Sequence, residues 1–356
     1  LLVRGAMPEL ADGGSVIDRA GLFRVAARAA VESRLVWREG RRWRLAHGPL
    51  PAARLRNMPV RDWTVLVQGV NLYVPAADRL LRRFSFVPHA RLDDLMVSYA
   101  APGGGVGPHV DSYDVFLIQA SGTRVWRIGR ARSAADHALL EDAPLQILRR
   151  FAPGEEYLLE PGDLLYLPPG WAHEGTAIAA GMTCSVGFRA PAHSELASEF
   201  LQRYAERIEL PGLYADPGLR PQRHAAAIPP AMIAETQALL AKLRFTRAEV
   251  ARFLGEYLSE PKARVVFGRP RRALSPARFG TLLSRTGARL DARTLMLFNG
   301  RDFFVNGERI SAEPPTQRAL TALADARVLP PGRYNAGLRR ILHGWHIAGW
   351  LHPGGE

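Results

Sequence analysis

The pattern of hydrophobic residues changes character near residue 191. Before this point, short apolar runs are separated by Pro and Gly, which is typical of antiparallel strands in a barrel or sandwich. After it, apolar residues recur at helical spacing, as Leu196, Phe200, Tyr204 and Ile208 do at intervals of four. The pattern therefore predicts an α+β protein, with a strand-rich first part followed by helices.

The first part is predicted to hold a hairpin and five further strand-like runs. Residues 33–48 alternate apolar and polar residues on both sides of a turn at Glu39-Gly40. Residues 61–84 instead show helical spacing and are predicted to be helical. The five further runs are DDLMVSYAAP, DVFLIQ, TRVWRIG, EEYLLEPGDLLYLPPG and MTCSVGFRA.

The second part predicts helices and one more hairpin. Two Asn-Gly pairs, Asn299-Gly300 and Asn306-Gly307, mark turns of a hairpin over residues 294–310. Because helical patterns flank this hairpin, we expect a small winged-helix-like module. The predicted helical segments are 193–210, 232–244, 246–260, 315–327 and 338–351. The predicted domains are a barrel over 1–191, a helical region over 192–264 and the winged-helix-like module over 265–356.

Composition narrows the class of protein. Hydrophobic residues make up 47% of the chain, which is enough for real cores, and no apolar run is long enough to span a membrane. The one cysteine, Cys184, excludes an internal disulfide and a cysteine-based metal centre, which favours a reducing, cytoplasmic setting. The chain begins LLVRGAMPEL, without an initiator Met, so we expect the natural N-terminus to lie upstream.

The charge is strongly positive and comes almost entirely from arginine. The formal net charge is +13, and Lys242 and Lys262 are the only lysines among 47 basic residues. Residues 264–356 hold fifteen arginines against six acidic residues. Two interpretations stay open: a solvated basic surface that reflects genome composition, or affinity for a polyanion such as RNA.

Three residues form a candidate metal site. In a strand, residues two apart share a face, so His109 and Asp111, after a glycine-rich approach, can point the same way. The segment PGDLLYLPPGWAH then provides His173. Two imidazoles and one carboxylate are the facial triad of mononuclear non-haem Fe(II) oxygenases. A zinc hydrolase with the same ligands is chemically possible, but it would leave Arg124, described next, without a role.

A cation is predicted near the triad. Arg124 shares one face of a strand with Trp126, and a buried arginine needs an anion, such as a carboxylate of 2-oxoglutarate. Thr183 and Ser185 alternate on the strand after His173 and are candidates for additional hydroxyl contacts. The GGGVG stretch is no dinucleotide fingerprint, because Pro108 occupies the last glycine position.

The chain resembles the bacterial ribosomal oxygenases. The stretches that carry the resemblance include DDLMVSYAAPGGGVGPHVDSYDVFLIQ, RVWRIG, LEPGDLLYLPPGWAHEG and SVGFRAP. These relatives are cupin-fold, JmjC-type enzymes with a double-stranded β-helix (jelly-roll) barrel, and they hydroxylate an arginine of large-subunit ribosomal protein L-sixteen. The resemblance covers nearly the whole chain and is strongest between residues 93 and 191.

The resemblance implies roles for the candidate residues. His109, Asp111 and His173 are expected to bind Fe(II), and Arg124 to pair with the cosubstrate 2-oxoglutarate, which yields succinate and CO2 while the arginine β-carbon is hydroxylated. Tyr113 and Asp114, beside the triad, are candidate contacts for the substrate guanidinium. The expected quaternary structure is a homodimer formed through the middle helices, with a C-terminal winged helix.

Two other functions remain open at this stage. A JmjC-type oxygenase or demethylase of a different basic protein would have the same site. A non-catalytic cupin and winged-helix regulator would use the barrel as a ligand sensor and bind nucleic acid with a steep salt dependence. Direct contact with RNA is compatible with the charge in either case.

Overall fold

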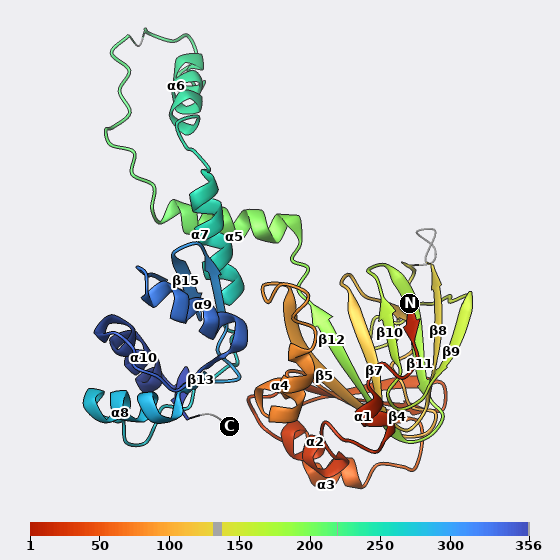
Figure 1. Ribbon diagram of the computed structural model, residues 1–356. Coiled ribbons are helices and arrows are strands. Elements are labelled where there is room, and N and C mark those ends of the chain that lie inside the picture. Colours follow the sequence, from red (N-terminus) through yellow and green to blue (C-terminus); the bar gives the residue numbers. More distant parts are fainter. Residues whose placement is uncertain (131–136, 219, 355–356) are drawn as a thin grey trace. The chain divides into compact units, whose positions relative to one another are not determined.

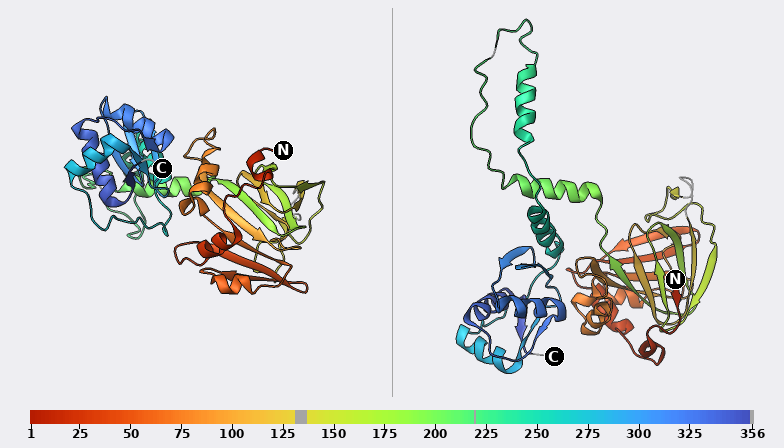
Figure 2. Two further views of the ribbon diagram at one scale, coloured as in Figure 1. Left: turned by 60° about the horizontal axis from the view of Figure 1, so that its bottom comes forward. Right: turned by 45° about the horizontal axis from the view of Figure 1, so that its top comes forward.

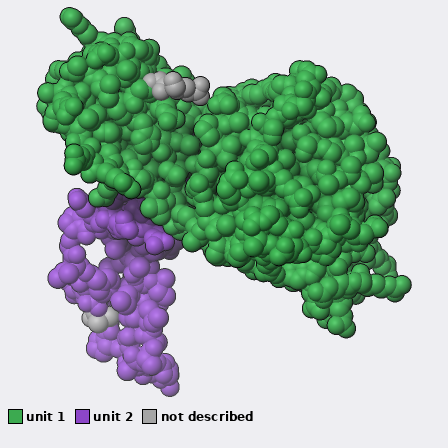
Figure 3. All heavy atoms as spheres, turned by 90° about the horizontal axis from the view of Figure 1, so that it is seen from below, with its two compact units in different colours: residues 1–190, 261–295, 314–356 green, residues 191–260, 296–313 purple. Residues whose placement is uncertain are grey.

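The computed structural model describes residues 1–130, 137–218 and 220–354. The chain divides into two compact units (Figure 3). The first unit comprises Leu1–Ala190, Pro261–Leu295 and Pro314–Glu356, and the second comprises Pro191–Glu260 and Met296–Glu313. Among the described helices, none is both long and apolar enough to cross a bilayer.

Two antiparallel sheets form the strand-rich part of the first unit (Figures 1 and 2). This arrangement confirms the predicted α+β fold with a cupin-type barrel. The larger sheet has the order β1 (Leu2–Val3), β10 (Leu164–Leu167), β7 (Val115–Ser121), β12 (Gly181–Phe188), β5 (Leu92–Ala100), β4 (Trp63–Val67), β2 (Ser33–Glu39) and β3 (Arg42–His47). The smaller sheet has the order β6 (His109–Val110), β11 (Trp171–Ala177), β8 (Arg124–Arg130) and β9 (Glu155–Leu159).

In the barrel part, the alternation of side chains directs buried residues of one strand to two different clusters. On β7, Leu117 packs toward the barrel interior with Trp126 and Ile128 of β8. Its neighbour Ile118 points to the opposite face and joins the larger outer cluster, which includes Phe23. Helices supply part of that cluster: α1 (Pro8–Ala11), α2 (Arg19–Ala26), α3 (Ala52–Arg56) and α4 (Pro75–Arg82), with a 3-10 turn at Val70–Leu72.

The predicted helix over residues 61–84 is wrong in its first part. Trp63–Val67 is a strand, β4, in which all five residues are buried, and the helix α4 begins only at Pro75. A strand that is buried on both faces lacks the apolar–polar alternation that identifies strands. The predicted hairpin over residues 33–48 is confirmed as β2 and β3.

The C-terminal part of the first unit combines three helices with a small sheet. The helix over 276–286 was not predicted, although Ser275 caps it and Pro276 opens it, which are ordinary start signals. The elements are α8 (Pro276–Thr286), α9 (Thr316–Ala326), α10 (Ala336–Ala348) and the sheet β17 (Val328–Leu329), β13 (Ala288–Leu290), β18 (Leu351–Pro353).

The second unit packs a helix against a small three-stranded sheet, which forms where the sequence predicted a single hairpin. Thr246 and Glu249 form a capping box at the start of α7 (Arg247–Ser259). A Cβ on Gly255 of α7 would lie 2.3 Å from the Phe304 ring of the hairpin, so only glycine fits there. The remaining elements are α5 (His193–Ala205), α6 (Pro230–Leu240), β14 (Met296–Asn299), β15 (Asp302–Val305) and β16 (Glu308–Ser311).

Candidate active site

The structure brings the two predicted histidines together across a pair of strands. His109 of β6 lies directly opposite His173 of β11, and their ring centroids are 4.2 Å apart. Each Nδ1 lies 3.0 Å from a backbone carbonyl, that of Gly107 for His109 and that of Trp171 for His173. When Nδ1 donates to the carbonyl, Nε2 keeps its lone pair for a metal ion.

Asp111 completes the cluster. Its Oδ2 lies 3.6 Å from Nε2 of His173, and one ligand atom from each of the three residues lies within 4.8 Å of the other two. Burial, together with the neighbouring His109 ring, lowers the pKa of His173. The ring is therefore neutral at physiological pH, which is the form that binds metal ions.

The cluster opens into a cavity of about 430 Å³ between the two sheets. Its walls come from both sheets, with apolar residues such as Val115 and Leu117 from β7 and Trp126 from β8. A cavity of this size lies within the range of small-molecule binding sites.

Arg124 lies in the wall of this cavity with an incomplete set of partners. It is 6% exposed, and its guanidinium reaches the Ser98 hydroxyl at 3.5 Å and lies 5.7 Å from the centre of the Trp126 ring. Its Nε has no hydrogen-bond partner among the described residues. Burial lowers the pKa of Arg124 to about 10, so the group remains charged at neutral pH. A buried cation with an unmatched donor fits an anionic ligand.

The two predicted hydroxyl residues differ in their placement. Ser185 is buried and lines the cavity. Thr183 is also buried, but its hydroxyl donates to Oε1 of Gln119 at 2.9 Å, and it is not among the residues that line the cavity. The structure therefore makes the Ser185 hydroxyl, and not that of Thr183, accessible to a ligand.

The two candidate substrate contacts, Tyr113 and Asp114, also differ in their placement. Tyr113 lines the cavity, and partial burial beside Asp111 raises its pKa to about 12. Asp114 does not line the cavity, because its carboxylate accepts from the Tyr166 hydroxyl at 2.7 Å and from Arg91 at 3.3 Å.

Comparisons with known proteins agree with this geometry. A model of the JmjC domain matches residues 79–196, and a model of a ROXA-like winged helix matches residues 239–352. The ribosomal protein uL16 3-hydroxylase of Escherichia coli is 36% identical over 310 residues, which are 84% of this chain and 79% of that protein. The chain belongs to the ribosomal oxygenase family. The winged helix predicted from the sequence is thereby confirmed.

Solved structures of the family extend over almost the whole chain. The X-ray structure of Escherichia coli YcfD has a TM-score of 0.87 and 30% identity, and the match covers 99% of this chain and 94% of that one. A structure of YcfD in complex with cobalt and 2-oxoglutarate has a TM-score of 0.81 and 31% identity, with 95% and 91% covered.

This ribosomal oxygenase also has cavity residues that its sequence did not reveal. Asp93 and Asp94 line the cavity, and Nζ of Lys262 lies 2.9 Å from the first carboxylate and 3.3 Å from the second. Burial raises the pKa of Asp94, while Lys262 acts in the opposite direction. No sequence signal joins these residues, because Lys262 lies 168 positions beyond Asp94.

Proposed function

We propose that this chain is an Fe(II)- and 2-oxoglutarate-dependent oxygenase that hydroxylates the β-carbon of an arginine in ribosomal protein uL16. This is the large-subunit protein that the sequence analysis calls L-sixteen. The observation that carries the proposal is the joint placement of the His–Asp–His cluster and the unmatched Arg124 guanidinium in one cavity. The Escherichia coli relative is a uL16 3-hydroxylase, which supports the substrate. Because bacterial ribosomal proteins are made in the cytoplasm, we place the activity there.

His109, Asp111 and His173 hold the metal ion in this proposal. Two imidazole nitrogens and one carboxylate oxygen suit Fe(II) and leave neighbouring coordination positions for cosubstrate and dioxygen. Fe(II) held by these residues, together with 2-oxoglutarate, would supply the activation of dioxygen, in which one oxygen atom would enter the substrate C–H bond as hydroxyl and the other would enter succinate with loss of CO2. The cobalt and 2-oxoglutarate complex of YcfD supports this pairing.

The protein orients the two organic molecules. Arg124 and the Ser185 hydroxyl are proposed to bind the far carboxylate of 2-oxoglutarate, because both are buried donors that line the cavity. A direct contact between Thr183 and the cosubstrate stays a prediction. In the structure the Thr183 hydroxyl donates to Gln119 and not into the cavity. The Trp126 ring, 5.9 Å from the His173 ring, excludes water from the ligand cluster.

The substrate arginine is proposed to enter beside the acidic residues of the cavity. Asp93 is half-buried and Tyr113 is partly exposed, and both line the cavity, so a guanidinium there meets the Tyr113 ring and competes with Lys262 for the Asp93 carboxylate. The predicted role of Asp114 in substrate binding stays a prediction, because its carboxylate is bound by Tyr166 and Arg91.

We also propose that the chain forms a homodimer through the second unit. Helix α6 has no buried residue, and Met232, Ile233, Leu239 and Leu240 on it are each at least 40% exposed. A helix with so much exposed apolar surface gains stability when a second copy covers it.

The experiment that tests the function measures succinate. The full-length chain is incubated with Fe(II), 2-oxoglutarate, air and purified uL16, with the His109→Ala variant as the control. We expect succinate release that depends on uL16 and is lost in the variant. Succinate release that is independent of uL16 would support an oxygenase activity and contradict uL16 as the substrate. No release in any sample would contradict the enzymatic function and favour a ligand sensor.

A further inference from the structure

The C-terminal part of the first unit carries an excess of arginine that its own fold does not use. Residues 261–295 and 314–354 contain thirteen arginines and one lysine, while their acidic residues are Asp291 and Asp325. Charges of one sign at this density repel one another unless an anion lies close by.

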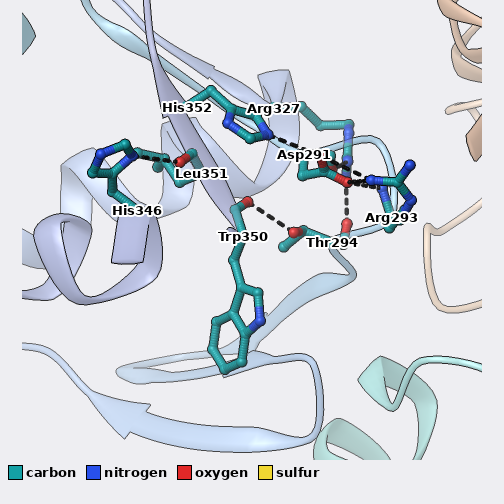
Figure 4. Close-up of polar contacts among 8 residues, drawn as sticks. All are labelled: Asp291, Arg293, Thr294, Arg327, His346, Trp350, Leu351 and His352. Atoms are coloured by element: carbon teal, nitrogen blue, oxygen red, sulfur yellow. Dashed lines mark hydrogen bonds and ion pairs between the residues drawn. The ribbon is translucent and has the colours of Figure 1, made fainter. Parts of the chain in front are cut away.

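The interior of this part accounts for two of the arginines (Figure 4). Asp291 accepts hydrogen bonds from Nε2 of His352 at 2.8 Å and from the side chain of Arg293 at 3.3 Å. Arg327 is 8% exposed and donates to the backbone carbonyls of Thr294 at 2.8 Å and Asp291 at 2.7 Å. These groups hold the loop after β13 in place and face the protein.

The other eleven arginines are exposed. Among the described residues, none of their guanidinium groups makes an ion pair or a hydrogen bond, so these side chains are available to a partner. They are Arg264, Arg269, Arg271, Arg272, Arg278, Arg285, Arg289, Arg318, Arg333, Arg339 and Arg340.

Several of these arginines come together because an irregular segment, residues 264–274, runs along α10. The Phe267 ring lies 6.1 Å from the ring of Trp350, just beyond the C-terminal end of the helix. Toward the middle of the helix, Nε2 of His343 lies 2.8 Å from the carbonyl oxygen of Leu274. The segment and the helix are therefore neighbours over about two turns.

Arginines from both elements consequently flank the contact between Leu274 and His343. The segment contributes Arg269, Arg271 and Arg272, and α10 contributes Arg339 and Arg340, which precede the contact with the segment by about one turn. We call these five residues the arginine edge. Half-buried Trp350 and Phe267 lie beside it and add aromatic rings to a cationic surface.

We propose that the arginine edge binds the phosphate backbone of RNA. The planar guanidinium fork matches a pair of phosphate oxygens, and each neutralised phosphate releases counterions, so affinity comes from charge and not from sequence. The choice of RNA among polyanions rests on the proposed function, since a protein substrate from the ribosome is encountered with ribosomal RNA. The edge then holds the enzyme near its substrate without entering the active site.

The test measures RNA binding by the full-length chain. Fluorescence anisotropy with a labelled, unstructured 20-nucleotide RNA is recorded over a series of salt concentrations. The edge variant combines Arg271→Gln, Arg272→Gln and Arg340→Gln. The matched control combines Arg24→Gln, Arg41→Gln and Arg56→Gln, which removes three exposed arginines without ion pairs from the barrel part.

We expect the edge variant to bind roughly tenfold or more weakly than wild type at 0.1 M salt, and the salt slope to fall by about 2, as for three lost single-strand contacts. The control should bind like wild type. The proposal is overturned if wild type does not bind RNA, if both variants weaken equally, or if duplex DNA or vesicles of anionic lipid bind as tightly as RNA.

A second readout separates this proposal from the proposed function. Succinate release with purified uL16 should be the same in the edge variant and in wild type, because the edge does not contribute to the cavity. If no variant releases succinate but the edge still governs RNA binding, the proposed function fails while the RNA site stands.

Discussion

At the scale of single residues, Arg124 is the buried cation that we propose selects an anionic ligand for the cavity. The barrel buries a permanent charge beside an indole ring and a serine hydroxyl, and leaves its Nε without a protein partner. Taking a cation out of water without an anion is unfavourable, so the chain alone carries a cost that an anionic ligand offsets. Stability and ligand binding are therefore in opposition at this position.

The Arg124→Met variant tests this opposition. We expect its Tm without ligand to be no lower than that of wild type, because the substitution removes an unmatched charge and keeps much of the volume. The KM for 2-oxoglutarate should rise roughly 10- to 100-fold, as expected for a lost charge-assisted hydrogen bond. Arg127→Met, on the exposed face of the same strand, is the control and should leave this KM unchanged.

A second residue connects stability with pH. Burial alone would raise the pKa of Asp291, but hydrogen bonds from His352 and Arg293 outweigh it and lower the pKa below its ordinary value. A carboxyl group with a lower pKa in the folded state stabilises the fold above its unfolded pKa, near 3.9. That stabilisation is lost as the pH falls through the folded-state value.

We therefore expect Asp291→Asn to reduce the free energy of unfolding at pH 7 by about 1–3 kcal/mol. The difference from wild type should shrink as the pH is lowered below about 4. Urea unfolding at several pH values measures this. Asp325→Asn, which removes the exposed acid of the same region, should show no such loss, and an equal loss in both variants would contradict the assignment.

At the scale of elements, the pairing of β11 with β8 aligns the candidate ligands with the cavity wall. Gly175 lies opposite Trp126 in this ladder, and a Cβ on Gly175 would lie 2.7 Å from the indole ring. That ring in turn lies 5.9 Å from His173. The glycine thus lets the indole lie flat across the strand and close one side of the ligand cluster.

Replacing Gly175 with Ala should destabilise the barrel by about 1–3 kcal/mol, because the ring must move to admit a methyl group. We also expect kcat to fall, since the displaced indole disturbs the His173 ring. Gly154→Ala is the control, because a Cβ there would have its nearest neighbour at 3.9 Å. Thermal unfolding measures the loss of stability, and succinate release measures the fall in kcat. A Gly175→Ala variant that behaves like wild type in both measurements would contradict the proposed packing of Trp126 against Gly175.

At the scale of the whole molecule, exposed apolar residues concentrate in the second unit. Helices α5 and α6 contain no buried residue, unlike the helices that cover the barrel. Such surface in an isolated chain favours association, and a symmetric pair of copies covers it on both chains at once.

Leu239→Glu combined with Leu240→Glu should convert the proposed homodimer to a monomer in light scattering behind a sizing column. Two buried charges in an apolar interface have no partner, which makes association unfavourable. Val60→Glu combined with Ile178→Glu, at exposed apolar positions of the first unit, should leave the dimer intact. A monomeric wild-type chain would refute the proposed dimer.

The sequence predicted those features that depend on local periodicity. The hairpin near Asn299 follows from its turn residues, and the structure has it. The structure also brings His109 and Asp111 together, although Asp111 lies just beyond the end of β6 and does not share a strand face with His109. The sequence could not identify Trp63–Val67 as a strand, because a run buried on both faces has no polar side. It also missed the Asp93–Lys262 pair, which exists only through long-range packing.

The measurement that tests the account most directly is tandem mass spectrometry of uL16 after incubation with the full-length chain, Fe(II), 2-oxoglutarate and air. We predict a gain of one oxygen atom on a single arginine, located at its β-carbon, and no gain without 2-oxoglutarate or with His109→Ala. An unmodified uL16 under conditions where the chain binds metal and 2-oxoglutarate, or an oxygen atom on a residue other than arginine, would contradict the account.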